Sequence, residues 1–208
     1  MRIIGTVGLP GSGKGEAATV AQEAGIPVVT MGDVIREETR RRGLDPSEHH
    51  GEIAKQLREE EGETAIADRC IPMVRDAAEG QDGEPVVLVD GLRSMAEVER
   101  FVDAFGEDFL LLSIEAPFDL RAKRLGDRGR EATDLDREKL REREERELGF
   151  GMGEVMDAAD LTIENDDTLE AFREQVEAVL ERGAAAIDER DSAGSRTQSG
   201  DVTRGEQR

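Results

Sequence analysis

A glycine-rich segment near the start of the chain carries residues that could bind phosphate. Residues 8–17 read GLPGSGKGEA and follow the apolar run RIIGTV. They fit the pattern G-x-x-x-x-G-K, in which backbone N–H groups and the lysine contact phosphate oxygens. Lys14 would also neutralise the phosphoryl group that is transferred. The alternative is a glycine-rich turn without a ligand. The residues expected to bind a nucleotide are Gly8, Leu9, Pro10, Gly11, Ser12, Gly13, Lys14, Gly15 and Glu16.

The position that normally holds a Ser or Thr hydroxyl for Mg²⁺ is occupied by Gly15. A metal ion would therefore need another protein ligand. Asp90 ends the apolar run PVVLVD, and an acidic side chain at the carboxyl edge of a sheet can hold Mg²⁺ through its water shell. We expect Asp90 to be that ligand. Because Asp-Gly is also common in turns, a structural cap is the alternative.

Three segments, GLPGSGKGE, MGDVIRE and VVLVDGLRS, together resemble the adenylate kinase group of P-loop kinases. The likeness is greatest to an uncharacterised archaeal family of nucleotide-kinase-related P-loop proteins, which also resembles dephospho-coenzyme A kinases. In adenylate kinases the loop reads G-K-G followed by Thr, whereas the archaeal family usually has G-K-S-E, so this chain mixes the two. The resemblance implies ATP and Mg²⁺ as cofactors and transfer of the γ-phosphoryl group to a small acceptor such as a nucleotide.

The resemblance also implies an acceptor site. The segment TMGDVIREE is similar to the S/T-G-D-x-L-R segment of adenylate kinases, with Met31 replacing the hydroxyl residue. By that likeness Arg36 holds the acceptor phosphate and Arg93 shares the task, since two guanidinium groups suit bidentate recognition. Asp33 matches an aspartate of dephospho-coenzyme A kinases that could accept the proton of a hydroxyl acceptor. The alternatives are surface salt bridges for the arginines and an N-cap for Asp33.

A polar, glycine-containing segment at about residues 126–135 is expected to be a small lid. Arg128 and Arg130 resemble lid arginines of this kinase group and would stabilise the transferred phosphoryl group. Arg124 is a candidate for stacking on adenine. Asn165 matches an asparagine near the ATP base in dephospho-coenzyme A kinases, although a turn or a helix cap explains it equally well.

Two classes of function remain open at this point. Within the kinases, the two arginines favour a phosphate-bearing acceptor and Asp33 favours transfer to a hydroxyl. A nucleotide-dependent regulatory switch, which binds ATP and a protein partner, is the other class. The missing loop hydroxyl favours the switch, whereas the acceptor-like arginines and the lid favour the kinase.

The elements that must position these residues alternate along the chain. Short apolar runs, namely RIIGTVG, IPVVTM, PVVLVD, DFLLLSIEA and ADLTIEN, are separated by helical patterns, which indicates a parallel sheet covered on both faces. The resemblance then implies an α/β P-loop kinase three-layer sandwich with a small lid and a five-stranded parallel sheet in the order 2-3-1-4-5. The predicted helices cover residues 13–24, 32–42, 51–61, 63–79, 95–105, 118–125, 135–148 and 168–182.

The length of 208 residues favours one domain, expected at residues 1–182 with an acceptor-binding segment at about 31–80. Residues 183–208 contain few apolar side chains and are expected to be disordered. No signal-like segment and no apolar run of about 18 residues is seen, so we expect a cytoplasmic protein without a membrane partner. The single cysteine, Cys70, is expected to be a small buried side chain.

The net charge of the chain bears on which kinds of partner it can bind. The chain has 49 acidic and 28 basic residues, a formal net charge of −21, no Trp and no Tyr. Nucleic acid is therefore not an expected partner, because binding it requires a basic face and aromatic side chains. Strong self-repulsion is tolerable at high salt, so the acidity indicates a saline cytoplasm. His49 and His50 lie in a predicted polar connection and suggest neither a metal site nor a catalytic pair.

Overall fold

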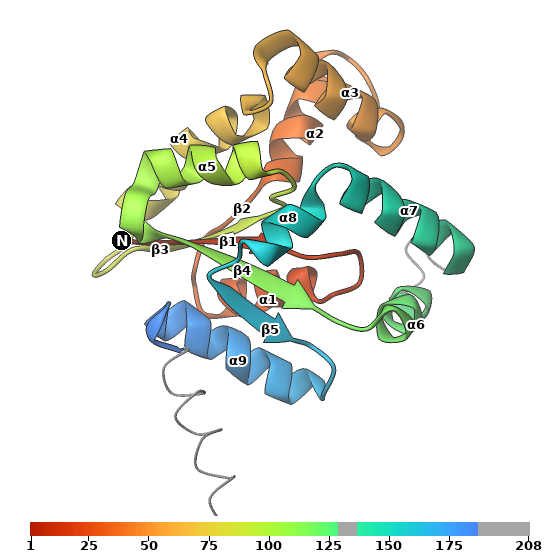
Figure 1. Cartoon of the computed structure of the whole chain (residues 1–208). Helices are drawn as coiled ribbons and strands as arrows, with labels where there is room; N and C mark the ends of the chain where they lie inside the picture. The colour runs from red at the N-terminus through yellow and green to blue at the C-terminus, as the bar shows by residue number, and fades with distance from the viewer. Residues whose placement is uncertain (129–136, 187–208) are drawn as a thin grey trace, which may run out of the picture.

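A five-stranded, all-parallel sheet forms the centre of the computed structural model, which describes residues 1–128 and 137–186 (Figure 1). Its strands are β1 (Arg2–Val7), β2 (Val28–Thr30), β3 (Val86–Asp90), β4 (Phe109–Glu115) and β5 (Leu161–Glu164). They lie in the order β2-β3-β1-β4-β5, which confirms the predicted order. Because the strands are parallel, their carboxyl ends meet at one edge of the sheet.

Helices connect the strands and cover both faces of the sheet. They are α1 (Lys14–Glu23), α2 (Met31–Arg41), α3 (Pro46–Glu61), α4 (Ala65–Glu79), α5 (Met95–Phe105), α6 (Phe118–Arg128), α7 (Arg137–Gly149), α8 (Met152–Asp157) and α9 (Leu169–Arg182), with a short 3₁₀ turn, η1 (Gly106–Asp108), before β4. The three-layer α/β class predicted from the sequence is confirmed.

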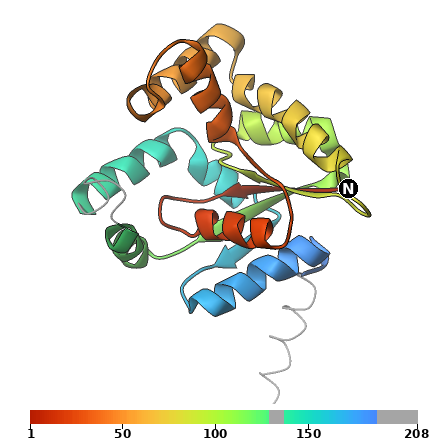
Figure 2. The ribbon, with the colours of Figure 1, turned by 180° about the vertical axis from the view of Figure 1, so that it is seen from behind.

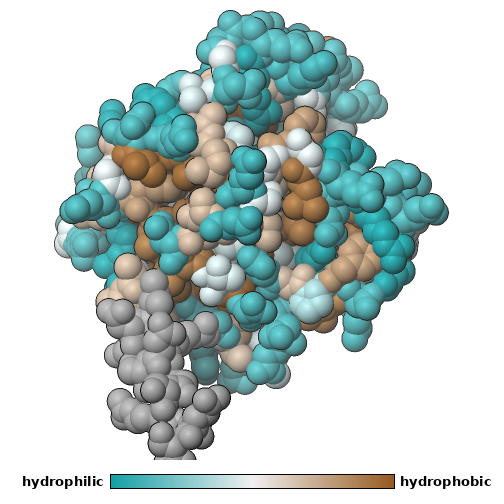
Figure 3. All heavy atoms as spheres, viewed as in Figure 1, coloured by the Kyte–Doolittle hydropathy of each residue, from teal (hydrophilic) through white to brown (hydrophobic). Residues whose placement is uncertain are grey.

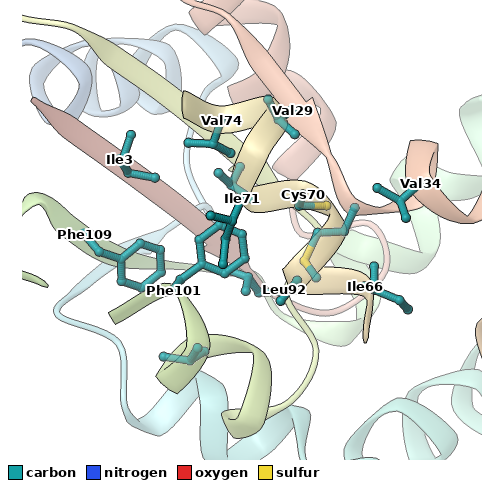
Figure 4. Close-up of a cluster of buried hydrophobic side chains, with 14 of the residues drawn as sticks. Ile3, Val29, Val34, Ile66, Cys70, Ile71, Val74, Leu92, Phe101 and Phe109 are labelled. Atoms are coloured by element: carbon teal, nitrogen blue, oxygen red, sulfur yellow. The ribbon is translucent and has the colours of Figure 1, made fainter. Parts of the chain in front are cut away.

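Alternate residues of the strands pack into two separate cores. Ile3, Val87 and Leu111 face helices α2, α3, α4, α5 and α8, and Phe101 of α5 stacks on Phe109 with ring centroids 5.5 Å apart (Figure 4). On the opposite face, strand residues such as Ile4 pack against α1 and α9, which Figure 2 shows side by side. In the two central strands β1 and β4 all but one residue of each strand is buried, so their apolar runs are almost continuous in the sequence, whereas β5 at the edge alternates buried and exposed residues.

Two helical segments differ from the prediction. Helix α3 begins at Pro46 and not near residue 51, because the Asp45 side chain accepts a hydrogen bond from the Ser47 N–H and Pro46 suits the first turn. His49 and His50 are therefore helical, and their assignment to a polar connection is wrong. Helix α8, also unpredicted, has only six residues and follows Gly151, whose φ is +93°.

The remaining predictions concern the lid, the C-terminal tail, Cys70 and the surface. The lid segment lies mostly outside the described residues, as does the tail apart from residues 183–186. Cys70 is fully buried, as expected, and burial raises the pKa of its thiol to about 12. The face shown in Figure 3 is mostly hydrophilic, with hydrophobic side chains in small separate groups. Among the described helices, none has the length and apolar character needed to cross a membrane.

Candidate active site

The phosphate-binding loop connects β1 to α1 and is shaped by glycine. At Gly8 and Gly13 the backbone has φ values of +147° and +124°, which side chains rarely adopt. A Cβ atom at Gly13 would lie 2.3 Å from Asn165 Nδ2, and one at Gly8 would lie 2.3 Å from the Ile114 carbonyl oxygen. Only glycine allows the loop to fold this tightly against the ends of β4 and β5.

The N-terminus of α1 presents free donors. Within the described chain, the backbone N–H groups of Gly13, Lys14 and Gly15 have no hydrogen-bond acceptor, whereas the next two N–H groups bond to the Gly13 carbonyl. These donors and the positive end of the helix dipole suit a bound phosphate group. The loop therefore fits the nucleotide phosphates that its sequence predicts.

Lys14 lies half-buried over the loop. Its Nζ donates hydrogen bonds to the carbonyl oxygens of Gly8 and Leu9. Burial lowers the pKa of this amine, while the negative charges of Asp90 and Glu147, a residue of α7, act in the opposite direction. The ammonium group thus lies at the carboxyl edge of the sheet, close enough to Asp90 for their charges to interact.

Asp90 is held by a residue that the sequence did not single out. Thr6 is fully buried on β1, beside Asp90 in the sheet register. Its hydroxyl donates a hydrogen bond of 3.0 Å to Asp90 Oδ1. Asp90 caps no helix, because Ser94 is the N-cap of α5, so the cap alternative is wrong. Among the described residues, the second carboxylate oxygen has no hydrogen-bond partner, so it can face a metal ion or its water shell.

The described residues contain no cluster of three acidic, His or Cys side chains that could enclose a metal ion. A single carboxylate nevertheless fits Mg²⁺, which keeps several waters and commonly takes one or two protein ligands together with substrate phosphates. Gly15 adds no ligand, and its Cβ position is open, with no atom within 4 Å.

Asn165 ties the end of β5 to the phosphate loop. The side chain is 5% exposed; Nδ2 donates to the Ser12 carbonyl at 2.7 Å, and Oδ1 accepts from Arg124 Nη2 at 3.0 Å. The N-cap of α9 is Thr168, so the cap alternative for Asn165 is wrong. Both ends of the amide are thus occupied by protein, and Asn165 supports the loop and orients Arg124.

A pocket of about 360 Å³ opens beside this amide. Arg124 and Asn165 border it together with Gly13, Glu16, Leu120, Lys123, Asp167, Leu169 and Phe172. It lies next to the start of α1, where a nucleotide base would follow its phosphates. Glu16 itself forms an ion pair with Arg173 of α9, so its carboxylate is already engaged by the protein.

The predicted acceptor residues Asp33 and Arg36 lie on α2. Arg36 donates to Asp33 Oδ1 through Nε at 3.0 Å and Nη2 at 2.6 Å, so a salt bridge does form. Both side chains remain accessible, at 38% and 54% exposure for Arg36 and Asp33. Asp33 lies within the first turn of α2, and Thr30 occupies the N-cap position, so the N-cap alternative for Asp33 is wrong.

Arg93 follows Asp90 in the connection between β3 and α5. Its backbone N–H donates to Glu97 Oε2 at 2.9 Å, and Glu97 Oε1 accepts from Arg58 of α3 at 2.9 Å. Glu97 is 1% exposed. The Arg93 side chain is exposed and forms no salt bridge with the described residues. Its charge acts on both Lys14 and His50. Glu97 therefore fixes the backbone from which Arg93 reaches these two groups.

His50 is the residue at this site that sequence reasoning dismissed. Its ring is half-buried on α3. Burial lowers the pKa of the ring, and the charges of Arg93 and Arg36 act in the same direction. The DPSE sequence, an N-cap followed by Pro, could have shown that His50 is helical, but not which groups its ring faces.

The structure describes little of the two predicted lid arginines, Arg128 and Arg130. Arg130 lies outside the described residues, and Arg128 is the last residue of α6, with no described side chain. Arg121, which was not chosen as a site residue, is 3% exposed and donates to the Pro10 carbonyl at 3.3 Å and to Glu144 of α7 at 2.8 Å. It fastens α6 and α7 to the phosphate loop. On α7, Arg143 pairs with Glu147 at 3.3 Å, as expected for an i,i+4 pair.

Comparison of the sequence with known proteins identifies the family of this chain. The family described as "AAA domain" matches residues 7–141. A UPF0200 protein of Halobacterium salinarum is 55% identical over 180 residues, covering 86% of this chain and 93% of that protein. A UPF0200 protein of Methanosarcina barkeri is 50% identical over 181 residues, covering 86% and 95%. The predicted resemblance to an archaeal P-loop family is confirmed.

Solved structures agree in fold. A Thermus thermophilus protein is similar with a TM-score of 0.59 and 22% identity, covering 88% of this chain and 97% of that one. Shikimate kinase from Bacteroides thetaiotaomicron is similar with a TM-score of 0.56 and 18% identity, covering 86% and 98%. At these identities the likeness shows the fold alone.

Proposed function

This chain belongs to the UPF0200 family, and from its P-loop kinase-like fold we propose that it is an ATP-dependent phosphotransferase. The proposed reaction transfers the γ-phosphoryl group of ATP, with Mg²⁺, to a small acceptor that bears a phosphate group. Nucleotides are the proposed acceptor class, and dephospho-coenzyme A, which offers both phosphate and hydroxyl, is an alternative.

One observation carries the proposal: Arg93 follows Asp90, the end of β3, by only three residues, its side chain is exposed, and its charge acts on Lys14 of the phosphate loop. A donor phosphate at the loop and an acceptor anion at the arginines would therefore be neighbours. Placing two reactants side by side in fixed orientation is a large part of phosphoryl transfer catalysis. A nucleotide-binding switch needs no second cationic group beside the phosphate loop.

The donor side is supported by the loop and the adjoining pocket. The free N–H groups at the start of α1 and Lys14 would hold the donor phosphates, and Arg124 would lie against the base. Asp90 would hold the metal ion from the strand end. ATP supplies the phosphoryl group when bound, and Mg²⁺ neutralises its charge. Residues 8–16 are the proposed nucleotide-binding segment, although Glu16 contributes only at the pocket wall.

The acceptor side rests on Arg36 and Arg93. Both present guanidinium groups that suit a phosphate. Asp33 shares only Oδ1 with Arg36, so its other oxygen can accept a proton from a hydroxyl acceptor, whereas a phosphate acceptor is already ionised and needs no base. Arg128 and Arg130 remain proposed lid residues for the transferred group.

The proposal is tested by ATP consumption in about 2–3 M KCl, where repulsion between surface charges is screened. Nucleoside monophosphates, dephospho-coenzyme A and small alcohols are offered in turn. We expect one phosphate-bearing acceptor to accelerate turnover in the parent, and Lys14→Ala to lose productive ATP binding while keeping its fold, because Lys14 supplies charge and little core packing.

Circular dichroism of Lys14→Ala is the control for folding. Unchanged nucleotide affinity in the folded variant would contradict the phosphate-loop assignment. Slow hydrolysis that no acceptor alters, but that a protein from the cell extract stimulates, would instead support the regulatory switch.

A further inference from the structure

Three polar side chains lie side by side where β1, β3 and β2 end. In the sheet register, Asp90 pairs with Thr6 of β1 on one side and with Thr30 of β2 on the other. Residues paired in this way point to the same face of a sheet, and side chains two positions apart in a strand share a face. Leu88 and Val28, two positions earlier, pack in the core that faces α1 and α9. Thr6, Asp90 and Thr30 therefore continue the α1 face to the carboxyl edge of the sheet, where the phosphate loop leads into α1.

The two threonine hydroxyls differ in what they contact. Thr6 is fully buried and donates a hydrogen bond of 3.0 Å to Asp90 Oδ1. Thr30 is half-buried and occupies the N-cap of α2, where a threonine oxygen usually accepts a backbone N–H of the first turn. Its side chain forms no such bond, and it has no hydrogen-bond partner elsewhere in the part of the chain that the structure describes. The Thr30 hydroxyl is thus able to bind a ligand beside Asp90.

We propose that the Thr30 hydroxyl supplies the metal contact that the phosphate loop lacks at Gly15, by hydrogen bonding to a water of the Mg²⁺ shell beside Asp90. The inference rests on the proposed function and deepens its metal site. Thr6 holds one oxygen of Asp90, so the other oxygen and the Thr30 hydroxyl contact the same hydrated ion. The hydroxyl missing from the loop pattern is then replaced from a neighbouring strand.

The spacing of the strands suits a contact through water. Neighbouring strands lie about 4.8 Å apart. Mg²⁺ binds oxygen at about 2.1 Å, and a bound water donates a hydrogen bond of about 2.8 Å. An ion with one water therefore spans about one strand spacing. A threonine hydroxyl can accept this bond through its lone pairs, and a contact through water is nearly as favourable as a direct one.

The Thr30→Val variant tests the inference, because valine has nearly the same shape as threonine and suits a strand. No cap hydrogen bond is lost, so the variant should keep its fold. ATP affinity is measured by calorimetry at increasing Mg²⁺ concentration, in about 2–3 M KCl and without an acceptor. We expect the Mg²⁺ concentration for half-maximal ATP binding to rise roughly fivefold, and ATP affinity in EDTA to stay unchanged.

Three further variants separate the hydroxyl from other effects of the substitution. Thr30→Ser keeps the hydroxyl and should titrate like the parent. Thr162→Val makes the same change on β5, at the opposite edge of the sheet, and should leave the titration unchanged. Gly15→Ser in the Thr30→Val background returns a hydroxyl to the loop and should recover most of the loss.

The inference is overturned if Thr30→Val and the parent give the same Mg²⁺ titration, or if Thr30→Ser is impaired as much as Thr30→Val. It is also overturned if ATP affinity in EDTA falls as far as affinity with Mg²⁺, since Thr30 would then contact the nucleotide. These measurements contain no acceptor, so such results leave the proposed transfer standing. The expected Mg²⁺ shift, with no transfer to any acceptor, would reject the proposed function alone.

Discussion

Gly15 is where the phosphate loop departs from its pattern, and the surrounding space would accept a side chain. It is exposed, and nothing lies within 4 Å of its Cβ position. We predict that Gly15→Ser supplies a metal-directed hydroxyl and lowers the Mg²⁺ concentration for half-maximal ATP binding roughly fivefold, equivalent to about 1 kcal/mol. The measurement is a Mg²⁺ titration of ATP affinity.

Gly15→Ala is the matched control, since it adds the same Cβ without a hydroxyl, and both alanine and serine have a higher helix propensity than glycine. Both variants should melt at a slightly higher temperature than the parent, and only the serine should change the Mg²⁺ titration. Identical titrations for serine and alanine would mean that no metal ion lies beside position 15.

Helices α2, α3 and α4 are joined through one buried carboxylate, Glu38, which is 4% exposed. Glu38 accepts hydrogen bonds from Arg41 of α2, from Arg42 at the C-cap of α2 and from Arg69 of α4. Arg42 also donates to Glu60 of α3 at 2.7 Å. The hydrogen bond from Arg41 is the main cause that lowers the pKa of Glu38 to about 2. This group of ion pairs keeps α3, and with it His50, in position.

Because the folded pKa of Glu38 lies below its ordinary value of 4.5, this carboxylate stabilises the fold above pH 4.5. The contribution is lost as pH falls from there toward 2. We predict that Glu38→Gln lowers the free energy of unfolding at neutral pH by roughly 2 kcal/mol and flattens its decline in acid. Denaturant unfolding at several pH values measures both effects.

The neighbouring exposed Glu37 provides the control variant Glu37→Gln, which should follow the parent at every pH. Parallel pH curves for Glu38→Gln and the parent would show that the Glu38 carboxylate has the same pKa in the folded and unfolded chains.

Over the whole molecule, acidic residues outnumber basic ones by 49 to 28, so pairing cannot neutralise the surface. The Debye length falls from about 10 Å at 0.1 M salt to about 3 Å at 1 M. We predict that the melting temperature rises by at least about 5 °C, or roughly 2 kcal/mol, over this range of KCl. Differential scanning calorimetry measures it, and sucrose, which is excluded from the surface but does not screen charge, is the control. An equal rise in sucrose would attribute the effect to exclusion and not to screening.

The sequence by itself determined the phosphate loop and the order of elements, because both depend on local signals. Glycine and lysine spacing defines the loop, and nearly continuous apolar runs mark strands that are buried on both faces. The start of α3 was also encoded locally, by Asp45 and Pro46, and the prediction missed it. The strand order came from the family resemblance, and the sheet confirms it.

Only the tertiary structure decided which side chains meet at the site. Thr6 bonds Asp90 across adjacent strands, and Asn165 bonds the Ser12 carbonyl across 153 positions of sequence. The spacing of His49 and His50 indicates no shared site, but the charges that act on His50 come from Arg36 of α2 and from Arg93 in the connection after β3. Periodicity reports which face of an element is buried. The partners of a polar side chain depend on how separate elements pack, and no local pattern records that.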